Sequence, residues 1–230
     1  ESEGTVIKQP RARIRPEPFR SFKGRCYAAA VSPSSAPILA ELGIGMLIIP
    51  QKPFVDHLED VKTHAELYRK VHGSEPPKPI MTSYVFCDKN EDRAHELARK
   101  YVAGYWREVV RHYELLGDHF KDIKNYEHYQ QQAADYDEDG VVDLFLGMQV
   151  FGTPEQCYER VKSMHDMFDN CASINAFKFA GMPYEEARAS MRLYAKEVMP
   201  EVKRLGDTAP FDDDTVVAPK FLTNRDYKAA

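Results

Sequence analysis

The sequence predicts an α/β fold built on a parallel β-sheet. Short apolar runs alternate along the chain with longer segments of helical periodicity, and this alternation is typical of parallel strands joined by helices. A strand at residues 25–31, a helix and a strand at residues 45–50 form the first βαβ unit, whose strands are parallel because the crossover returns the chain to the same edge. With 230 residues, 43% of them hydrophobic, the chain has enough apolar surface for a real core.

The chain opens with an extended connector. Residues 1–24 are rich in Arg and Pro and lack apolar periodicity, which predicts an extended segment that leads into the folded part of the chain. The run CYAAAV, bounded by Gly24 and SPSS, predicts a strand that is buried on both faces. Ser34 or Ser35 then serves as the N-cap of a helix that ends at Gly43, and GMLIIP predicts the second strand.

Two long helices flank the third strand. The first is predicted at residues 54–72, where apolar residues recur at helical spacing before Gly73. Its expected inner stripe is Phe54, Leu58, Val61, Ala65 and Tyr68. PIMTSYVFC predicts the strand, because it is rich in β-branched and aromatic residues. Asn90 or Asp88 caps the second helix, which runs to about Tyr113. The expected inner stripe of that helix is Ala94, Ala98, Tyr101, Tyr105, Val109 and His112.

The rest of the chain predicts an insert, a strand and a final helix. Residues 114–148 show weak helical character and no strand pattern, and a long insert of this kind predicts a lid over a binding site. In GTPEQ, Thr153 and the glutamine three residues later form a capping box in front of a helix. SINAFKFAG predicts a fourth strand, a long helix follows it, and residues 206–230 form an acidic tail.

Charge and composition exclude several classes of protein. The formal net charge is -5, and 31 basic residues are mixed with 36 acidic ones, so no basic stripe follows a nucleic-acid backbone. No apolar stretch approaches the roughly 20 residues that cross a bilayer. The four cysteines are widely spaced, and no His or carboxylate spacing matches a metal motif. We therefore expect a cytoplasmic protein with reduced thiols, no bound metal, no nucleic-acid partner and no membrane segment.

The candidate site is the turn VSPSS, at residues 31–35, between the first strand and its helix. Free backbone N–H groups and the dipole at the start of a helix favour an anion, and serine hydroxyls add neutral donors that can surround a phosphate. Ligands of parallel α/β folds bind at this end of the strands. The alternative is an ordinary serine N-cap in a tight turn, because a Ser-rich turn alone is a weak motif.

Two parts of the sequence resemble a known family. CYAAAVSPSSAPILAELGIGMLIIPQ resembles the strand, Ser/Thr turn and helix that hold the FMN phosphate in luciferase-like flavin-dependent monooxygenases. GTPEQCYERVKSMHDMF and GMPYEEARASMRLYAKEVMPEVKR resemble the closing part of the same family, in the same order and at the same separation. The resemblance implies that residues 25–205 are the C-terminal half of a (β/α)8 TIM-type barrel with parallel strands. It also leads us to expect that the first half of the barrel precedes Glu1.

The resemblance also implies a cofactor site. It places Ser32 and Ser35 on the phosphate of reduced FMN, with the backbone around Val31 and Ser34 beside it. Val31 stands where some relatives have an acidic residue. Pro50 stands where the light-emitting members have an aromatic residue near the flavin ring, so luciferase activity is not expected. The family's active-site histidine and phosphate-binding arginine belong to the first half of the barrel, so the resemblance assigns no catalytic residue in this chain.

The implied activity is the oxygenation of an organic small molecule with molecular oxygen and reduced FMN, which a separate flavin reductase supplies. A deazaflavin (F420)-dependent oxidoreductase on a similar barrel is the alternative within the family. A second alternative is a non-catalytic, flavin-binding partner subunit. The resemblance further implies a homo- or hetero-dimer.

Overall fold

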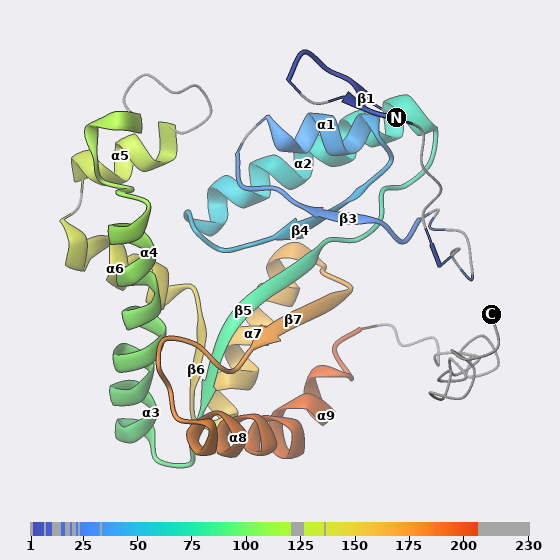
Figure 1. The fold of residues 1–230 in the computed structure, drawn as a ribbon. Helices are drawn as coiled ribbons and strands as arrows, with labels where there is room; N and C mark the ends of the chain where they lie inside the picture. The colour runs from blue at the N-terminus through green and yellow to red at the C-terminus, as the bar shows by residue number, and fades with distance from the viewer. Residues whose placement is uncertain are drawn as a thin grey trace, which may run out of the picture.

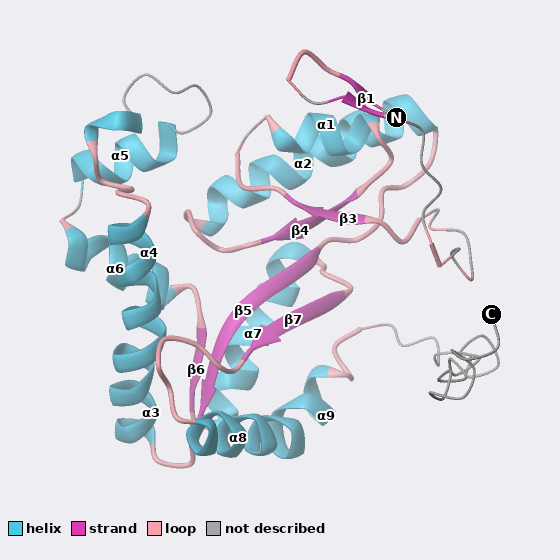
Figure 2. Cartoon of the chain, viewed as in Figure 1, coloured by secondary structure: helices cyan, strands magenta, loops and turns pink. Residues whose placement is uncertain are grey.

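The structure of the chain is a computed structural model that describes residues 2–6, 8–10, 15–16, 19, 22, 24–32, 34–120, 127–135 and 137–206. Its centre is a five-stranded parallel sheet with helices packed around it (Figures 1 and 2). The strands are β3 (Tyr27–Ala29), β4 (Gly45–Ile48), β5 (Ile80–Cys87), β6 (Val150–Gly152) and β7 (Ala172–Ala176). The predicted α/β fold with a parallel sheet is confirmed.

Strand β5 is the centre of the sheet. Its first residues pair with β4 on one side, where Leu47 lies opposite Ile80, and with β7 on the other, where Ala172 lies opposite Ile80. Its last residues pair with β6, where Cys87 lies opposite Gly152. β3 pairs with β4 and, within the described residues, with no other strand. The eight residues of β5 therefore hold β4, β6 and β7 together.

The four predicted strands are present, but they are shorter than expected. β3 covers only the middle of the run predicted at residues 25–31, because the chain already turns toward the next helix after Ala30. The prediction missed β6. Its three residues are all buried, and a strand that short shows neither alternation nor a long apolar run in the sequence.

Helices α1 (Ser35–Glu41) and α2 (Phe54–His72) pack on each other and match their predicted positions. Gly43 and Gly73 follow them with φ of 71° and 64°. Residues with a side chain rarely adopt this left-handed conformation, so glycine ends both helices.

The buried face of α2 differs from the predicted apolar stripe. The buried residues are His57, Asp60 and His64, whereas Phe54 and the other stripe residues are only partly buried. His64 is tolerated there because its Nε2 bonds the Ile44 carbonyl at 2.8 Å. A polar stripe at helical spacing therefore faces inward beside the apolar one.

The next long helix is interrupted by a wider turn. α3 (Glu91–Ala98) passes through a π-helical turn (Arg99–Ala103) into α4 (Gly104–His112). The predicted cap at Asn90 is confirmed, because its Oδ1 accepts the Arg93 N–H at 2.8 Å. A sequence pattern based on a uniform α-helix does not contain such a turn.

The π-helical turn displaces the inner stripe. Before and within it Ala94, Ala98 and Tyr101 are buried as predicted. One extra residue per turn advances the helix face by one position. The inward residues of α4 are therefore Trp106 and Val110. The prediction that Tyr105, Val109 and His112 form the inner stripe here was wrong, because Tyr105 and Val109 are only partly buried and His112 is exposed.

Residues 114–148 form turns and short helices where they are described. They contain a 3₁₀ turn (Asp118–Phe120), α5 (Glu127–Asp135) and α6 (Glu138–Gly147); residues 121–126 and 136 lie outside the described residues. The buried side chains of α6 are Val141, Val142, Phe145 and Leu146. The ring of Phe145 stacks on Trp106 with 4.2 Å between ring centroids. α6 is therefore part of the core, and the lid function of this segment stays a prediction.

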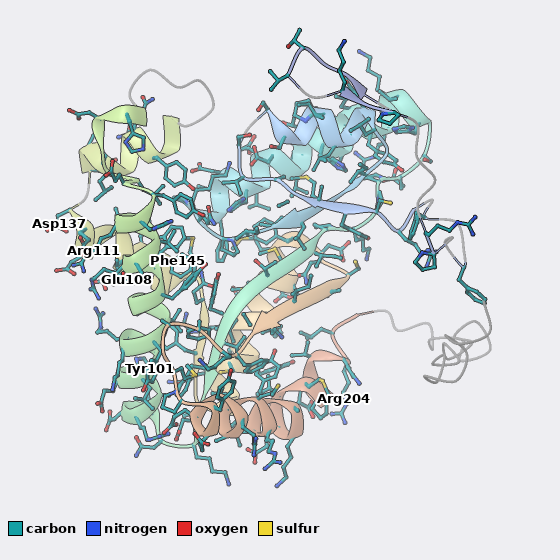
Figure 3. The ribbon with its side chains drawn as sticks, viewed as in Figure 1. Tyr101, Glu108, Arg111, Asp137, Phe145 and Arg204 are labelled. Atoms are coloured by element: carbon teal, nitrogen blue, oxygen red, sulfur yellow. The ribbon has the colours of Figure 1, made fainter. Side chains whose placement is uncertain are left out.

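Ion pairs at the surface join α4 to α6. Arg111 Nη2 lies 2.9 Å from Glu138 Oε1, and Arg107 Nη2 lies 3.0 Å from Asp139 Oδ1. Figure 3 shows Arg111 close to Asp137, the residue before α6, whose Oδ1 accepts the Gly140 N–H at 2.8 Å. These pairs fix the start of α6 against α4.

The closing helices follow the predicted order. α7 (Pro154–Phe168) begins at the predicted capping box, in which the Gln156 N–H donates to Thr153 Oγ1 at 3.3 Å and the Thr153 N–H donates to Gln156 Oε1 at 2.9 Å. α8 (Tyr184–Leu193), a second π-helical turn (Tyr194–Val198) and α9 (Met199–Val202) complete the fold. Residues 207–230, nearly all of the predicted tail, lie outside the described residues.

The core has three parts, one for each group of helices. The largest lies between α3, α4 and α6, the second between β5 and α7, and the third under α1.

Within the predicted connector, β1 (Ser2–Glu3) and β2 (Lys8–Gln9) pair antiparallel. Among the described residues, the helices are all too short or too polar to span a bilayer.

Candidate functional site

The serine turn, residues 31–35, of which residue 33 lies outside the described residues, leads from the carboxyl end of β3 into α1. Ser32 Oγ lies 3.1 Å from Ser34 Oγ and 2.9 Å from Ser35 Oγ. The Ser35 N–H donates to the Ser32 carbonyl at 2.9 Å, which closes the turn. The turn thus brings three hydroxyl groups together around Ser32.

Ser34 is the N-cap residue of α1, but its side chain makes no capping hydrogen bond. A capping serine usually has an extended backbone, whereas Ser34 is helical, with φ of -70° and ψ of -17°. Its hydroxyl lies beside Ser32 instead of bonding an amide of the first turn. The ordinary serine cap, the alternative interpretation of this motif, is therefore not formed.

The turn has the chemistry of an anion site. Hydroxyl groups rotate to donate to a ligand, and the amides at a helix start carry partial positive charge. The first turn of α1 contains no acidic residue, so its own side chains do not repel an anion. Val31, Ser32, Ser34 and Ser35 are all partly exposed, which leaves them accessible to a ligand.

The end of β4 lies beside the serine turn. Ala29 lies opposite Leu47, and the Ala30 N–H donates to the Leu47 carbonyl at 3.2 Å. Ser32 and Pro50 each stand three residues beyond the pair Ala29 and Leu47, so both segments emerge at the same edge of the sheet. We call residues 50–52 the β4 rim.

Every residue of the β4 rim is held by a side chain from another element. The contacts are Gln149 Nε2 to the Pro50 carbonyl (3.5 Å), Tyr129 Oη to Gln51 Oε1 (2.9 Å) and Lys52 Nζ to Asp60 Oδ2 (2.7 Å). The side chains of the ion pair are only 4% and 9% exposed, so this pair is buried. The β4 rim is consequently a fixed neighbour of the serine turn.

Sequence reasoning found the serine turn but missed the partners of the β4 rim. One signal was present: Asp60 falls between His57 and His64 at helical spacing, which marks an inward polar stripe on α2. Gln149 gave no such signal, because its contacts join residues far apart in the chain.

A second charged group lies at the carboxyl end of β5. Arg93 pairs with Asp88, and its Nη2 donates to both carboxylate oxygens of Glu186 at 2.6 and 2.7 Å. The Glu186 bond, with a further contribution from Asp88, raises the pKa of Arg93, which stays charged. These pairs tie β5 to α8 and are satisfied within the fold.

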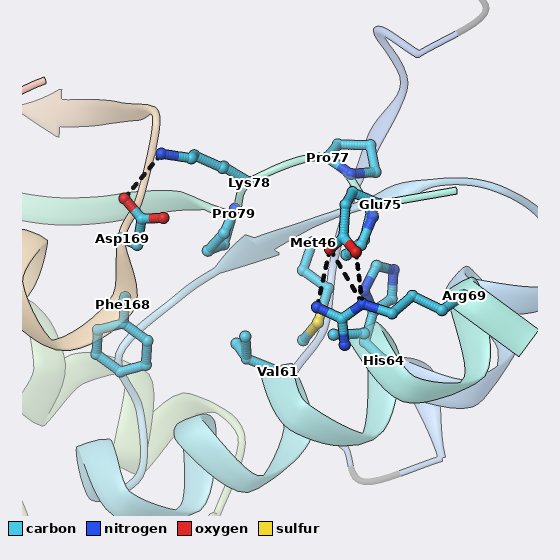
Figure 4. A pocket seen from close by; sticks show the side chains of 12 residues that line it. Met46, Val61, His64, Arg69, Glu75, Pro77, Lys78, Pro79, Phe168 and Asp169 are labelled. Atoms are coloured by element: carbon cyan, nitrogen blue, oxygen red, sulfur yellow. Dashed lines mark hydrogen bonds and ion pairs between the residues drawn. The ribbon is translucent and has the colours of Figure 1, made fainter. Parts of the chain in front are cut away.

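A cavity of about 300 Å³ lies at the opposite end of the strands, between α2 and the residues that precede β5 (Figure 4). Its floor is apolar, with Met46, Val61 and Phe168. Two ion pairs lie at its rim, Arg69 with Glu75 at 2.9 Å and Lys78 with Asp169 at 2.9 Å. Since the serine turn lies at the carboxyl ends of the strands, this cavity is not part of the candidate site.

Comparison with known proteins places these features in a family. Residues 1–171 match the luciferase-like monooxygenase family. The chain is 22% identical over 213 residues to the alkanal monooxygenase alpha chain of the Kryptophanaron alfredi symbiont, and 23% identical over 213 residues to that of Aliivibrio fischeri. Each alignment covers 88% of this chain but 58% of the relative, so the chain spans less than two thirds of the length of these relatives.

Solved structures share the fold. Monooxygenase RslO1 from Streptomyces bottropensis aligns with a TM-score of 0.54 at 18% identity, over 84% of this chain and 50% of that one. The coenzyme F420 dependent tetrahydromethanopterin reductase from Methanopyrus kandleri aligns with a TM-score of 0.52 at 16% identity, over 88% and 58%. The oxygenating constituent of 3,6-diketocamphane monooxygenase from Pseudomonas putida, solved in complex with FMN, aligns with a TM-score of 0.50 at 18% identity, over 76% and 47%. The predicted fold, part of a TIM-type barrel, is confirmed.

Proposed function

Because this chain belongs to the luciferase-like monooxygenase family, we propose that it binds reduced FMN and oxygenates an organic small molecule with molecular oxygen. The family supports an oxidoreductase of the monooxygenase type. The chain spans 58% of the length of its curated relatives, and the activity of a whole protein of this family is therefore part of the proposal.

The observation that carries the proposal is the serine turn. The hydroxyls of Ser34 and Ser35 lie within 3.1 Å of the Ser32 hydroxyl, and the Ser34 hydroxyl makes no capping hydrogen bond to an amide of α1. A phosphate at this point would accept hydrogen bonds from Ser32 and Ser35 and would interact favourably with the dipole of α1. The backbone around Val31 and Ser34 would line the same site.

The residues of this chain would bind and orient the cofactor, while the flavin supplies the reducing equivalents for oxygen activation. The β4 rim would form the wall next to the phosphate. Within residues 114–148, α5 would cover the site, because its Tyr129 donates a hydrogen bond to Gln51 of that rim. A cover of this kind excludes water from a reactive site. A separate reductase would supply the reduced flavin, and a second subunit would complete a dimer.

A deazaflavin is the second candidate cofactor. It is favoured by the similarity of the fold to an F420 dependent reductase, whose TM-score of 0.52 is close to the 0.54 of the monooxygenase RslO1. Such a cofactor would support hydride transfer without oxygen. Formation of an oxygenated organic product with reduced FMN and oxygen supports the first candidate, whereas turnover with reduced F420 and none with FMN supports the second.

The phosphate site is tested by replacing both Ser32 and Ser35 with Ala in the full-length protein. FMN affinity is expected to fall by at least about tenfold, which corresponds to about 1.4 kcal/mol. Riboflavin, which lacks the phosphate, should bind the variant and the parent equally well. The matched control is Ser83→Ala, which removes a buried hydroxyl from β5, away from the turn. Unchanged FMN affinity in the double variant would exclude a phosphate site at the turn.

A further inference from the structure

The sheet divides at its carboxyl end, between β4 and β5. The last paired residues of these strands are Ile48 and Met81, and from Val85 onward β5 pairs with β6 instead. Figure 1 shows β4 and β5 diverging beyond their short pairing. Between the two pairings, side chains replace the ladder, because Thr82 Oγ1 donates to the Ile48 carbonyl at 3.1 Å.

Gln149 fills the point of division. Its side chain is fully buried, and its Oε1 accepts the Tyr84 N–H of β5 at 3.0 Å. Its Nε2 donates to the Phe145 carbonyl at 3.2 Å and to the Pro50 carbonyl at 3.5 Å. One amide group therefore bonds β5 on one side and the β4 rim on the other.

The backbone of Gln149 is fixed as well. Its N–H donates to the Leu146 carbonyl at 3.0 Å, and its carbonyl accepts Arg160 Nη1 at 2.9 Å. The side chain consequently has little freedom to follow Pro50 if Pro50 moves. The distance between β5 and the β4 rim is set by a rigid, bifunctional spacer.

This spacer acts on the segment next to the serine turn. Ser32 and Pro50 stand at equal distances along the chain from the paired Ala29 and Leu47. A flavin is longer than a phosphate group, so a cofactor anchored at the turn must extend over neighbouring strand ends, where ligands of such folds bind. The next strand end in the described residues is the β4 rim.

We propose that Gln149 is a positioning residue for the flavin: it holds Pro50, the first residue of the β4 rim, where the part of the cofactor beyond the phosphate makes contact. This inference rests on the proposed flavin-binding function. It assigns to Gln149 no contact with the substrate or with the reacting atoms. Its effect passes through the Pro50 carbonyl.

The experiment compares Gln149→Leu with the matched control Asn170→Leu in the full-length protein, with FMN and riboflavin as probes. Asn170 is also a buried amide, and its Nδ2 donates to the Ala172 carbonyl at 2.9 Å, at the amino end of β7. Both variants lose a buried hydrogen bond and should melt at lower temperatures. A merely structural role predicts equal flavin affinity in the two variants.

The expected result is specific to Gln149. Gln149→Leu should weaken the binding of FMN and of riboflavin by the same factor, on the order of tenfold. This is the size expected when a ligand loses about one well-placed hydrogen bond or its equivalent in packing contacts. The visible spectrum of bound FMN should move toward that of free FMN, whereas Asn170→Leu should leave the affinity and spectrum unchanged. If Gln149→Leu does not fold, Gln149→Met supplies a side chain of similar length without the amide.

Three outcomes are distinguishable. Equal FMN affinity and spectra in the Gln149 and Asn170 variants would overturn the positioning role while leaving the proposed function intact. A loss confined to FMN, with riboflavin unaffected, would show that Gln149 acts on the phosphate, and would also overturn it. If the parent protein binds no FMN, both the proposed function and this inference are wrong.

Discussion

At the residue scale, four buried polar side chains each have a defined partner. Lys52, Asp60, His64 and Gln149 are all less than 9% exposed, and each makes a hydrogen bond or ion pair. A buried polar group that loses its partner costs about 1–3 kcal/mol, and an unpaired charge costs more. Three of the four lie in or directly beside the β4 rim, so stability and the geometry of the candidate site depend on the same contacts.

The ion pair between Lys52 and Asp60 gives the first prediction. Asp60→Asn leaves the Lys52 ammonium buried without a countercharge, and should lower the free energy of unfolding by roughly 3–5 kcal/mol. Glu59→Gln is the control, because its pair with Lys62 is exposed and should change stability by less than about 1 kcal/mol. Urea unfolding measures both. A loss for Asp60→Asn no larger than that for Glu59→Gln would contradict a buried, coupled pair.

His64 gives a prediction about pH. Burial lowers the pKa of His64, although the bond to the Ile44 carbonyl opposes this shift. In the unfolded chain the imidazole has its ordinary pKa of about 6.5, so below that pH the unfolded state binds a proton that the folded state does not. Stability should therefore be full above about pH 6.5 and fall as the pH drops from there toward the lower pKa of the folded state.

The measurement compares the parent with His64→Gln, which retains a donor for the Ile44 carbonyl but does not titrate. Unfolding free energies are determined between about pH 5 and pH 7.5, on either side of the ordinary histidine pKa. The parent should lose more stability than the variant on acidification. Parallel pH profiles would mean that His64 does not contribute to acid sensitivity.

At the element scale, the sequence predicted helix positions better than helix faces. Both ends of α2 agree with the prediction because Phe54 starts an apolar period and Gly73 stops it. The predicted buried faces of α2 and α4 were wrong for two physical reasons. Polar residues of α2 found buried partners, and the π-helical turn before Gly104 changed the register of α4. The first reason depends on residues outside α2, and the second on a turn that uniform α-helical spacing does not contain.

The changed register of α4 gives a prediction from a pair of neighbouring valines. Val110 is 3% exposed, whereas Val109 is only partly buried and lies at the edge of the same cluster. Val110→Ala should destabilise the protein by about 2 kcal/mol, because two buried methyl groups are lost and a cavity remains. Val109→Ala should cost less than half of that. Thermal or urea unfolding measures both variants. If Val109→Ala were the more destabilising of the two, the result would favour the helix face predicted from uniform α-helical spacing.

At the scale of the whole molecule, strand and helix alternation was sufficient to predict a parallel α/β fold, and the serine turn was recognised from its place after a strand. The division of the sheet was not predictable from this pattern. It depends on Gln149 reaching both Tyr84 and Pro50, which are 65 and 99 residues away. The site therefore divides into a part encoded by one short motif and a part that exists only after distant segments have packed.

The central place of β5 has a consequence for biosynthesis. Both β6 and β7, which complete its pairing, are made after it. At about 5–20 residues per second, the roughly 90 residues between the end of β5 and the end of β7 take on the order of 4 to 18 seconds to translate. During that interval the nascent chain carries an apolar strand that lacks one or both of these later neighbours, although β4 is already made. This is the period in which a chaperone would find a binding segment, and in which polysome-bound copies would be most prone to associate wrongly.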